Sequence, residues 1–277
     1  MTEPTTVQLR NGAAMPRLGL GTWPLKGAGA ERAVATALQL GYRSIDTAEA
    51  YGNEDGVGAG LRASGVARED VFVTTKFDKH FHGVDLVREA FEQSAERLGV
   101  DYVDLMLIHW PNPSHDKYVE AFEGLLGLLR DGLVRAVGTS NFKPAHLERL
   151  REATGEAPDV NQIQLSPLLT RDPSRAYHSA HGIVTESWSP LGGSGTEVLH
   201  EQLVRSLAEK YGRTPAQVVL RWHLELGLVT VPKSGNEQRM RENLEVLGFS
   251  LEPDDVAALS ALDKGEGAAV DSDAFGH

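Results

Sequence analysis

Residues 71–108 read VFVTTKFDKHFHGVDLVREAFEQSAERLGVDYVDLMLI. The segment opens with an apolar run at 71–75 and closes with another at Val103–Ile108. Between them, Leu86–Leu98 has apolar residues at the spacing of an amphipathic helix. Two strands joined by such a helix run parallel, because the helix returns the chain to the end of the sheet where it started.

The same alternation extends over most of the 277 residues. Further strand-like runs lie at 18–20, 44–46, 136–138, 160–163, 183–186 and 229–231, which makes eight in all. Further helical patterns lie at 31–40, 119–129 and 215–226. Eight strand–helix units without a long linker predict one α/β domain over residues 1–277, a (β/α)8 TIM barrel.

Two terminal segments stand outside this repeat. Val7 to Leu9, Asn11-Gly12 and 13–16 predict a β-hairpin with an Asn-Gly turn, placed as a plug over the N-terminal mouth of the barrel. The last segment, 265–277, is small and polar, and we expect a mobile loop there.

Composition excludes several classes of function. The sequence has no cysteine, which rules out disulfides, cysteine–zinc sites and thiol catalysis. Its net charge is −12, so it lacks the basic footprint of a nucleic-acid-binding protein. We find no signal peptide near the start and no apolar run long enough for a membrane span. We therefore expect a cytoplasmic monomer without nucleic-acid, membrane or metal partners.

Polar residues follow many of the predicted strands. Asp46, Lys76 and His109 each stand at or just after such a strand, and Ser140, Gln162, Trp188 and Lys233 do the same further along. In a (β/α)8 barrel the carboxyl ends of the strands meet at one mouth, where the chemistry is found. Taken singly, each residue could form an ion pair or a capped loop, but together they indicate a site.

Seven short motifs carry a resemblance to a known family. They are GLGTW at 19–23, DTAEAYGNE at 46–54, LIHWP at 107–111, GTSNF at 138–142, NQIQ at 161–164, WSPLG at 188–192 and VPKS at 231–234. In this order they resemble the aldo-keto reductases, and closely the prokaryotic branch that includes the 2,5-diketo-D-gluconate reductases. The resemblance runs from about residue 7 to residue 263, and it implies NADPH-dependent reduction of small aldehydes and ketones to alcohols.

Carbonyl reduction by hydride needs a proton donor for the developing alkoxide. The Tyr51 phenol can donate, and a cation such as Lys76 favours the phenolate that results. Asp46 would hold Lys76 charged, and His109 could orient the carbonyl oxygen. The resemblance assigns the same four roles. Each residue alone could instead be structural, with Tyr51 packed at the rim and Asp46–Lys76 a plain ion pair.

The sequence lacks a Rossmann fingerprint; we read the glycines at 56–60 as part of a short helix. The resemblance implies that NADPH or NADP+ lies across the barrel mouth, with Trp188 stacked on the nicotinamide and a loop containing Gly192, Gly193 and Gly195 near the pyrophosphate. The implied cofactor residues are Gly21, Thr22, Ser140, Asn141, Gln162, Trp188, Ser189, Leu191, Lys233, Ser234, Arg239, Glu242 and Asn243. Lys233 and Arg239 would receive the adenosine 2′-phosphate. The alternatives are an ordinary turn for the glycine loop and a solvated helix face for the last stretch.

Trp23, Phe77 and Trp110 are the expected walls of the substrate pocket. Two other functions stay open at this point. Some relatives bind the cofactor but act mainly as regulatory subunits of channels. A barrel hydrolase could use Asp46 and Glu49 as paired carboxylates, although Lys76 would then have no purpose.

Overall fold

The computed structural model describes residues 5–193 and 196–276. Eight parallel strands form one sheet in chain order, and parallel bridges at Leu18–Thr230 and Gly21–Lys233 join its last strand to its first. The sheet is therefore closed, which confirms the predicted (β/α)8 barrel. The strands are β3 (Leu20–Gly21), β4 (Ser44–Asp46), β5 (Phe72–Phe77), β6 (Val103–Ile108), β7 (Val134–Ser140), β8 (Val160–Gln164), β9 (Val184–Trp188) and β10 (Val229–Thr230).

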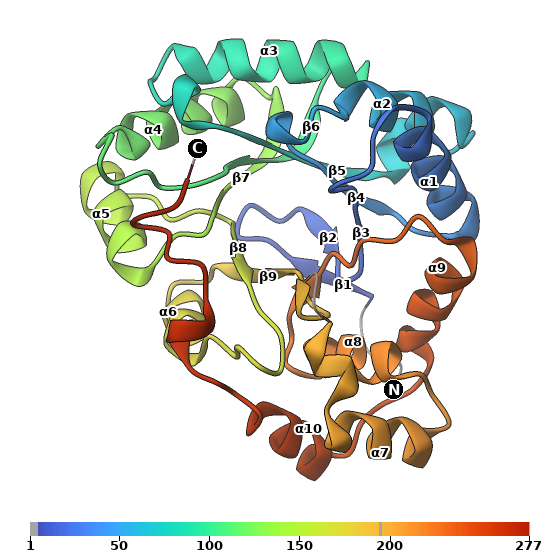
Figure 1. Cartoon of the computed structure of the whole chain (residues 1–277). Coiled ribbons are helices and arrows are strands. Elements are labelled where there is room, and N and C mark those ends of the chain that lie inside the picture. The colour runs from blue at the N-terminus through green and yellow to red at the C-terminus, as the bar shows by residue number, and fades with distance from the viewer. Residues whose placement is uncertain (1–4, 194–195, 277) are drawn as a thin grey trace.

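Helices surround these strands as an outer ring (Figure 1). They are α1 (Gly27–Leu40), α2 (Glu54–Ala63), α3 (Leu86–Leu98), α4 (Tyr118–Arg130), α5 (Pro144–Thr154), α6 (Asp172–Ala180), α7 (Gln202–Tyr211), α8 (Pro215–Glu225), α9 (Glu237–Leu244) and α10 (Pro253–Ser260). The start of α8 follows the sequence signal closely, since Thr214 caps it through Gln217 and Pro215 occupies its first turn.

Alternate residues of each strand face two different layers. Val73 and Phe77 of β5 belong to the large apolar cluster between strands and helices. Leu105 and Leu107 of β6 belong instead to the cluster inside the barrel. The period of two that defines a strand therefore separates side chains that can reach the barrel interior, such as Lys76, from neighbours that cannot.

The expected hairpin is present as β1 (Thr6–Gln8) and β2 (Ala14–Pro16), paired antiparallel. Its turn is longer than two residues, and Gly12 takes the left-handed backbone (φ +86°) that favours glycine. Met15 is fully buried in the same cluster as Phe72 and Val160, which begin β5 and β8. The hairpin thus covers the amino ends of the strands and closes that mouth.

The glycine-rich segment 56–60 lies within α2, as expected, and explains how tightly α2 packs. A Cβ atom on Gly58 would lie 2.2 Å from the carbonyl oxygen of Leu98, the last residue of α3. A Cβ on Gly56 or Gly60 would lie 2.7 Å from a backbone oxygen of α1. These glycines allow three helix backbones to approach, and no nucleotide-binding role is needed to account for them.

The C-terminal segment, expected to be a mobile loop, makes contacts with the rest of the barrel. Lys143 at the start of α5 donates to Asp271 (2.7 Å) and to Asp273 (2.6 Å). The Phe275 ring meets Trp110 edge-on, with centroids 4.8 Å apart. Composition alone could not show this docking, because its partners lie more than a hundred residues earlier in the chain.

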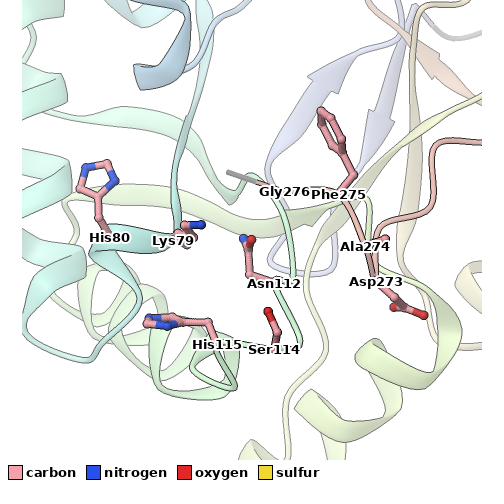
Figure 2. A pocket seen from close by; sticks show the side chains of 9 residues that line it. All are labelled: Lys79, His80, Asn112, Ser114, His115, Asp273, Ala274, Phe275 and Gly276. Atoms are coloured by element: carbon pink, nitrogen blue, oxygen red, sulfur yellow. The ribbon is translucent and has the colours of Figure 1, made fainter.

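The docked tail borders a cavity of about 430 Å³ at the carboxyl end of the barrel. Figure 2 shows Asp273, Phe275 and Gly276 of the tail on one side of the pocket and Lys79, His80 and His115 on the other, with Asn112 between them. Since Phe275 also touches Trp110, the cavity is adjacent to the predicted substrate residues.

Candidate active site

Lys76 is the centre of the polar cluster at the carboxyl ends of β4 and β5. Its ammonium group donates to both carboxylate oxygens of Asp46, at 2.8 and 2.9 Å, and to the backbone oxygen of Thr47 at 2.9 Å. The same nitrogen lies 3.4 Å from the hydroxyl of Tyr51, which ends the short helix η1 (Glu49–Tyr51). The Lys76 side chain is wholly buried, so water does not screen these contacts.

Burial and charge set the protonation of this cluster. Burial raises the pKa of Tyr51, while the Lys76 charge acts to lower it, so the phenol stays protonated in the resting site. Burial also disfavours the charged form of Lys76. The charge and hydrogen bonds of Asp46, together with Tyr51 and Glu186, more than offset that effect, and the pKa of Lys76 lies above its usual value. The site therefore joins a protonated phenol to a permanent cation.

His109 follows β6 and lies beside Tyr51, with the two rings edge-on and their centroids 5.7 Å apart. Its Nδ1 is 3.1 Å from Oδ1 of Asp78. Burial lowers the pKa of His109 and the nearby Lys76 charge contributes to the same effect, although Asp78 opposes both. The structure thus brings together all four residues expected to be catalytic.

Gln162 connects this cluster to a second buried acid. Its amide nitrogen donates to Asp46 (2.8 Å) and to Glu186 (2.7 Å), so both amide hydrogens are used within the barrel. Burial, followed by the charge of Asp46, raises the pKa of Glu186 to about 8. The Gln162 oxygen is the group left for an amide ligand such as a nicotinamide carboxamide.

Three other expected cofactor residues lie side by side at the ends of β7 and β9. Ser140 donates to the backbone of Gln162 at 3.0 Å. Asn141 donates to the Ser140 hydroxyl and to the backbone oxygen of His109, and its side-chain oxygen accepts from the Trp188 indole at 2.8 Å. These bonds hold the Trp188 ring at the edge of the site.

Two of the expected cofactor segments have distinctive backbone geometry. A Cβ on Gly21 would lie 2.7 Å from the Val231 oxygen, so only glycine fits between β3 and the segment after β10. Thr22 follows it and donates to the backbone oxygen of Asp46 at 2.9 Å. After β9, Ser189 and Gly192 both have positive φ, and the half-buried Leu191 lies between them. Gly195, expected in the same loop, lies outside the described residues.

The predicted phosphate-binding stretch leads into α9. Asn236 caps this helix by accepting from the backbone N–H of Arg239 at 3.0 Å. In the turn before it, the Ser234 hydroxyl donates to the backbone oxygen of Asn236 at 3.1 Å. Within residues 5–193 and 196–276, the side chains of Lys233 and Arg239 are exposed and make no ion pair. Of the two other residues expected here, Asn243 is buried and Glu242 accepts from Gln238.

The substrate residues are only partly as expected. Trp23 is 62% exposed at the rim, and Trp110 is buried beneath Phe275. Phe77 does not fit its predicted place, because its side chain is fully buried in the layer between strands and helices. Strand alternation explains this: Lys76 faces the barrel interior, so the next residue faces away.

Two acids near the site, Asp78 and Glu186, were not among the predicted site residues. A charged residue within a buried strand was the available signal for Glu186, whereas Asp78 looked like the start of a surface loop. The paired carboxylates of a hydrolase are not seen, since Asp46 binds Lys76 while Glu49 contacts His80 at 3.0 Å. Among the described residues, no group of acids and histidines could hold a metal ion, and no helix is long and apolar enough to cross a membrane.

Comparison with known proteins agrees with this geometry. The profile of the aldo/keto reductase family matches residues 17–264. Methylglyoxal reductase DkgA of Salmonella typhimurium is 46% identical over 276 residues, covering both chains in full. The crystal structure of a Gox0644 mutant in complex with NADPH has a TM-score of 0.94 at 42% identity, covering 99% of this chain and 100% of that one. The Bombyx mori aldo-keto reductase in complex with NADP has a TM-score of 0.87 at 33% identity, covering 95% and 94%. The chain is thus a member of the aldo/keto reductase family.

Proposed function

We propose that this protein reduces small aldehydes and ketones to alcohols with NADPH, using Tyr51 as the proton donor. The observation that carries the proposal is the position of Lys76, whose one nitrogen contacts both the Asp46 carboxylate and the Tyr51 hydroxyl. A structural ion pair alone would not place a buried cation against a phenol. In our proposal the chain works as a single domain and as a monomer.

The bound cofactor would supply the hydride that adds to the carbonyl carbon. Tyr51 would give its hydroxyl proton to the carbonyl oxygen, which completes the alcohol and leaves a phenolate. Lys76 stabilises that phenolate because it remains charged and is 3.4 Å away. Asp46 keeps the ammonium in place, and His109, whose ring lies beside that of Tyr51, orients the carbonyl oxygen.

The residues present fit the cofactor. The free oxygen of Gln162 can accept from the nicotinamide carboxamide, and Ser140 and Asn141 offer further polar groups beside it. Trp188, fixed by Asn141, can cover one face of the ring. At the other end, the exposed Lys233 and Arg239 would bind the adenosine 2′-phosphate, assisted by the amino end of α9. We therefore infer NADPH rather than NADH as the cofactor.

The substrate class follows from the relatives and from the pocket. Relatives that are 45–46% identical over their full length are named methylglyoxal reductases. The Trp110 ring lies beside that of His109, with centroids 6.3 Å apart, and Trp23 is exposed at the rim; apolar surface next to a polar group suits a short carbonyl compound. A regulatory role without turnover is not favoured, because all four catalytic groups are in contact with their partners.

The decisive test compares wild type with Tyr51→Phe. With methylglyoxal and a panel of simple carbonyl compounds, we expect NADPH oxidation by wild type, measured by absorbance. We expect at least a hundredfold lower kcat in the variant, on the order of the contribution of a general acid. Fluorescence titration should give the same NADPH affinity for both proteins. Equal turnover of the two would remove Tyr51 from the mechanism.

A further inference from the structure

Asp78 is a largely buried acid that contacts the side chain of His109. It follows β5 directly, and its Oδ1 lies 3.1 Å from Nδ1 of His109. The backbone holds the two segments side by side, since the His109 N–H donates to the Phe77 carbonyl oxygen at 3.0 Å. The exposed fractions of the two side chains are 14% and 12%, so water competes little for this contact.

The contact decides which ring nitrogen carries the proton. An ionised carboxylate has no hydrogen to donate, so Nδ1 must be the donor, and a neutral imidazole then has only a lone pair at Nε2. We infer that Asp78 is a positioning residue that fixes His109 in the Nδ1–H tautomer. His109 then donates to a carbonyl oxygen only as an imidazolium, because the Nε2 of its neutral form carries no hydrogen. This inference rests on the proposed carbonyl reduction.

The groups around His109 determine when the imidazolium forms. Asp78 and Lys76 come from the β5 side, Asp46 from β4 and Tyr51 from η1, while Asn141 after β7 donates to the His109 backbone oxygen. Burial and Lys76 lower the pKa of His109, and the two acids act in the opposite direction. Imidazolium therefore accumulates only at a lower pH than it would for a histidine in water. Reduction should be fastest at acid pH, with the transferred proton still passing through Tyr51.

The local structure allows Asp78 to be changed without loss of the loop. The backbone N–H of Asp78 donates to Glu49 at 3.4 Å, and the other oxygen of Glu49 is 3.0 Å from His80. These contacts do not involve the Asp78 side chain. Asp85, an exposed acid at the start of α3, offers a matched control, because it has the same charge and makes no contact with His109 in the described part of the chain.

The first experiment observes the tautomer directly and needs no turnover. The protein is labelled with 15N-histidine, and long-range proton–nitrogen NMR spectra show which ring nitrogens are protonated. His109→Gln identifies the His109 signals. We expect wild type and Asp85→Ala to show Nδ1 protonated above pH 7, and Asp78→Ala to show a mixture of tautomers. A wild-type ring protonated at Nε2 would overturn the inference, and this result does not depend on any variant folding.

The second experiment measures kcat for carbonyl reduction between pH 5 and 9. We expect wild type and Asp85→Ala to lose about tenfold per pH unit above the ionisation of His109. Asp78→Ala should give a flatter profile, because its neutral ring can donate from Nε2. Identical profiles for all three proteins would contradict the role of Asp78. If wild type reduces no carbonyl compound, the proposed function fails, and the NMR result alone decides whether Asp78 sets the tautomer.

Discussion

At the scale of single residues, we propose that Lys76 serves both catalysis and stability. Lys76→Met should lower kcat at least tenfold, because each pKa unit of lost phenolate stabilisation is about 1.4 kcal/mol. The substrate KM and the NADPH affinity should change little. Steady-state kinetics with fluorescence titration would check this, and a variant whose main defect is a raised KM would contradict it.

The same substitution leaves Asp46 buried without its cation. Removing one partner of a buried ion pair typically costs about 3–5 kcal/mol, so Lys76→Met should also unfold at lower urea concentration. Circular dichroism at the assay temperature must therefore accompany the kinetics, so that loss of folded protein is not counted as loss of catalysis.

Arg239 is the residue on which cofactor preference should depend. It is exposed and unpaired within the described residues, whereas Arg241 on the same helix is paired with Glu237 at 2.6 Å. Arg239→Ala should weaken NADPH binding about tenfold, since a charge-assisted hydrogen bond is worth roughly 1.5 kcal/mol at an exposed site. NADH binding should weaken much less, and Arg241→Ala should leave both unchanged. Equal losses for the two cofactors in Arg239→Ala would show that Arg239 does not bind the 2′-phosphate.

At the scale of elements, the three-helix contact through α2 can be tested with a pair of glycines. Gly58→Ala would bring a methyl group 2.2 Å from the Leu98 oxygen, and overpacking of this kind costs about 1–3 kcal/mol. Gly29→Ala in α1 meets no atom within 4 Å and should stabilise the protein by about 0.5–1 kcal/mol. The free energy of unfolding of both variants, measured in urea, tests this. Equal values for the two variants would mean that α2 can shift to accommodate the added methyl group.

How much the sequence could predict also differs between elements. The strands and the positions of Asp46, Lys76 and His109 at their carboxyl ends were predictable, because β4, β5 and β6 are short strand-like runs that end at or next to these residues. Strand alternation could also have predicted the orientation of Phe77, because the residue next to Lys76 must face away from the barrel interior. Contacts between distant segments were not predictable. Asp78 meets His109 only because β5 and β6 are neighbours in a fixed register, and no local pattern encodes that.

At the scale of the whole molecule, buried neutral histidines should make the fold sensitive to acid. Burial lowers the pKa of His178 to about 3, of His223 to about 4 and of His82 to about 4. Below pH 6.5 these three histidines bind protons in the unfolded chain, whereas in the folded chain they stay neutral until the pH approaches their lowered pKa values. The free energy of unfolding should therefore fall as the pH drops from 6.5 toward 4, by up to about 1.4 kcal/mol per pH unit for each histidine.

Urea unfolding at pH 7.5, 6 and 5 measures this slope. His178 accepts from Asn161 at Nε2 and contacts Thr185 through Nδ1, so His178→Gln keeps polar groups in the site but cannot titrate. Its stability should decline less steeply with falling pH than that of wild type, while the exposed His200→Gln should behave as wild type. A slope that is the same in all three proteins would exclude His178 as a source.

The hairpin β1–β2 has a consequence for the order of events in a catalytic cycle. Because it seals the amino ends of the strands around the fully buried Met15, every molecule that reaches the barrel interior must enter and leave by the opposite end. Gln162 and Ser140 are 2% and 1% exposed at the floor of that entrance, whereas Trp23 at its rim is 62% exposed. Because all ligands share this one entrance, we expect ordered binding. The nucleotide should bind first and leave last, and the carbonyl compound should bind and the alcohol leave in between. Product-inhibition kinetics should accordingly show NADP+ competing with NADPH, and the alcohol competing with neither substrate.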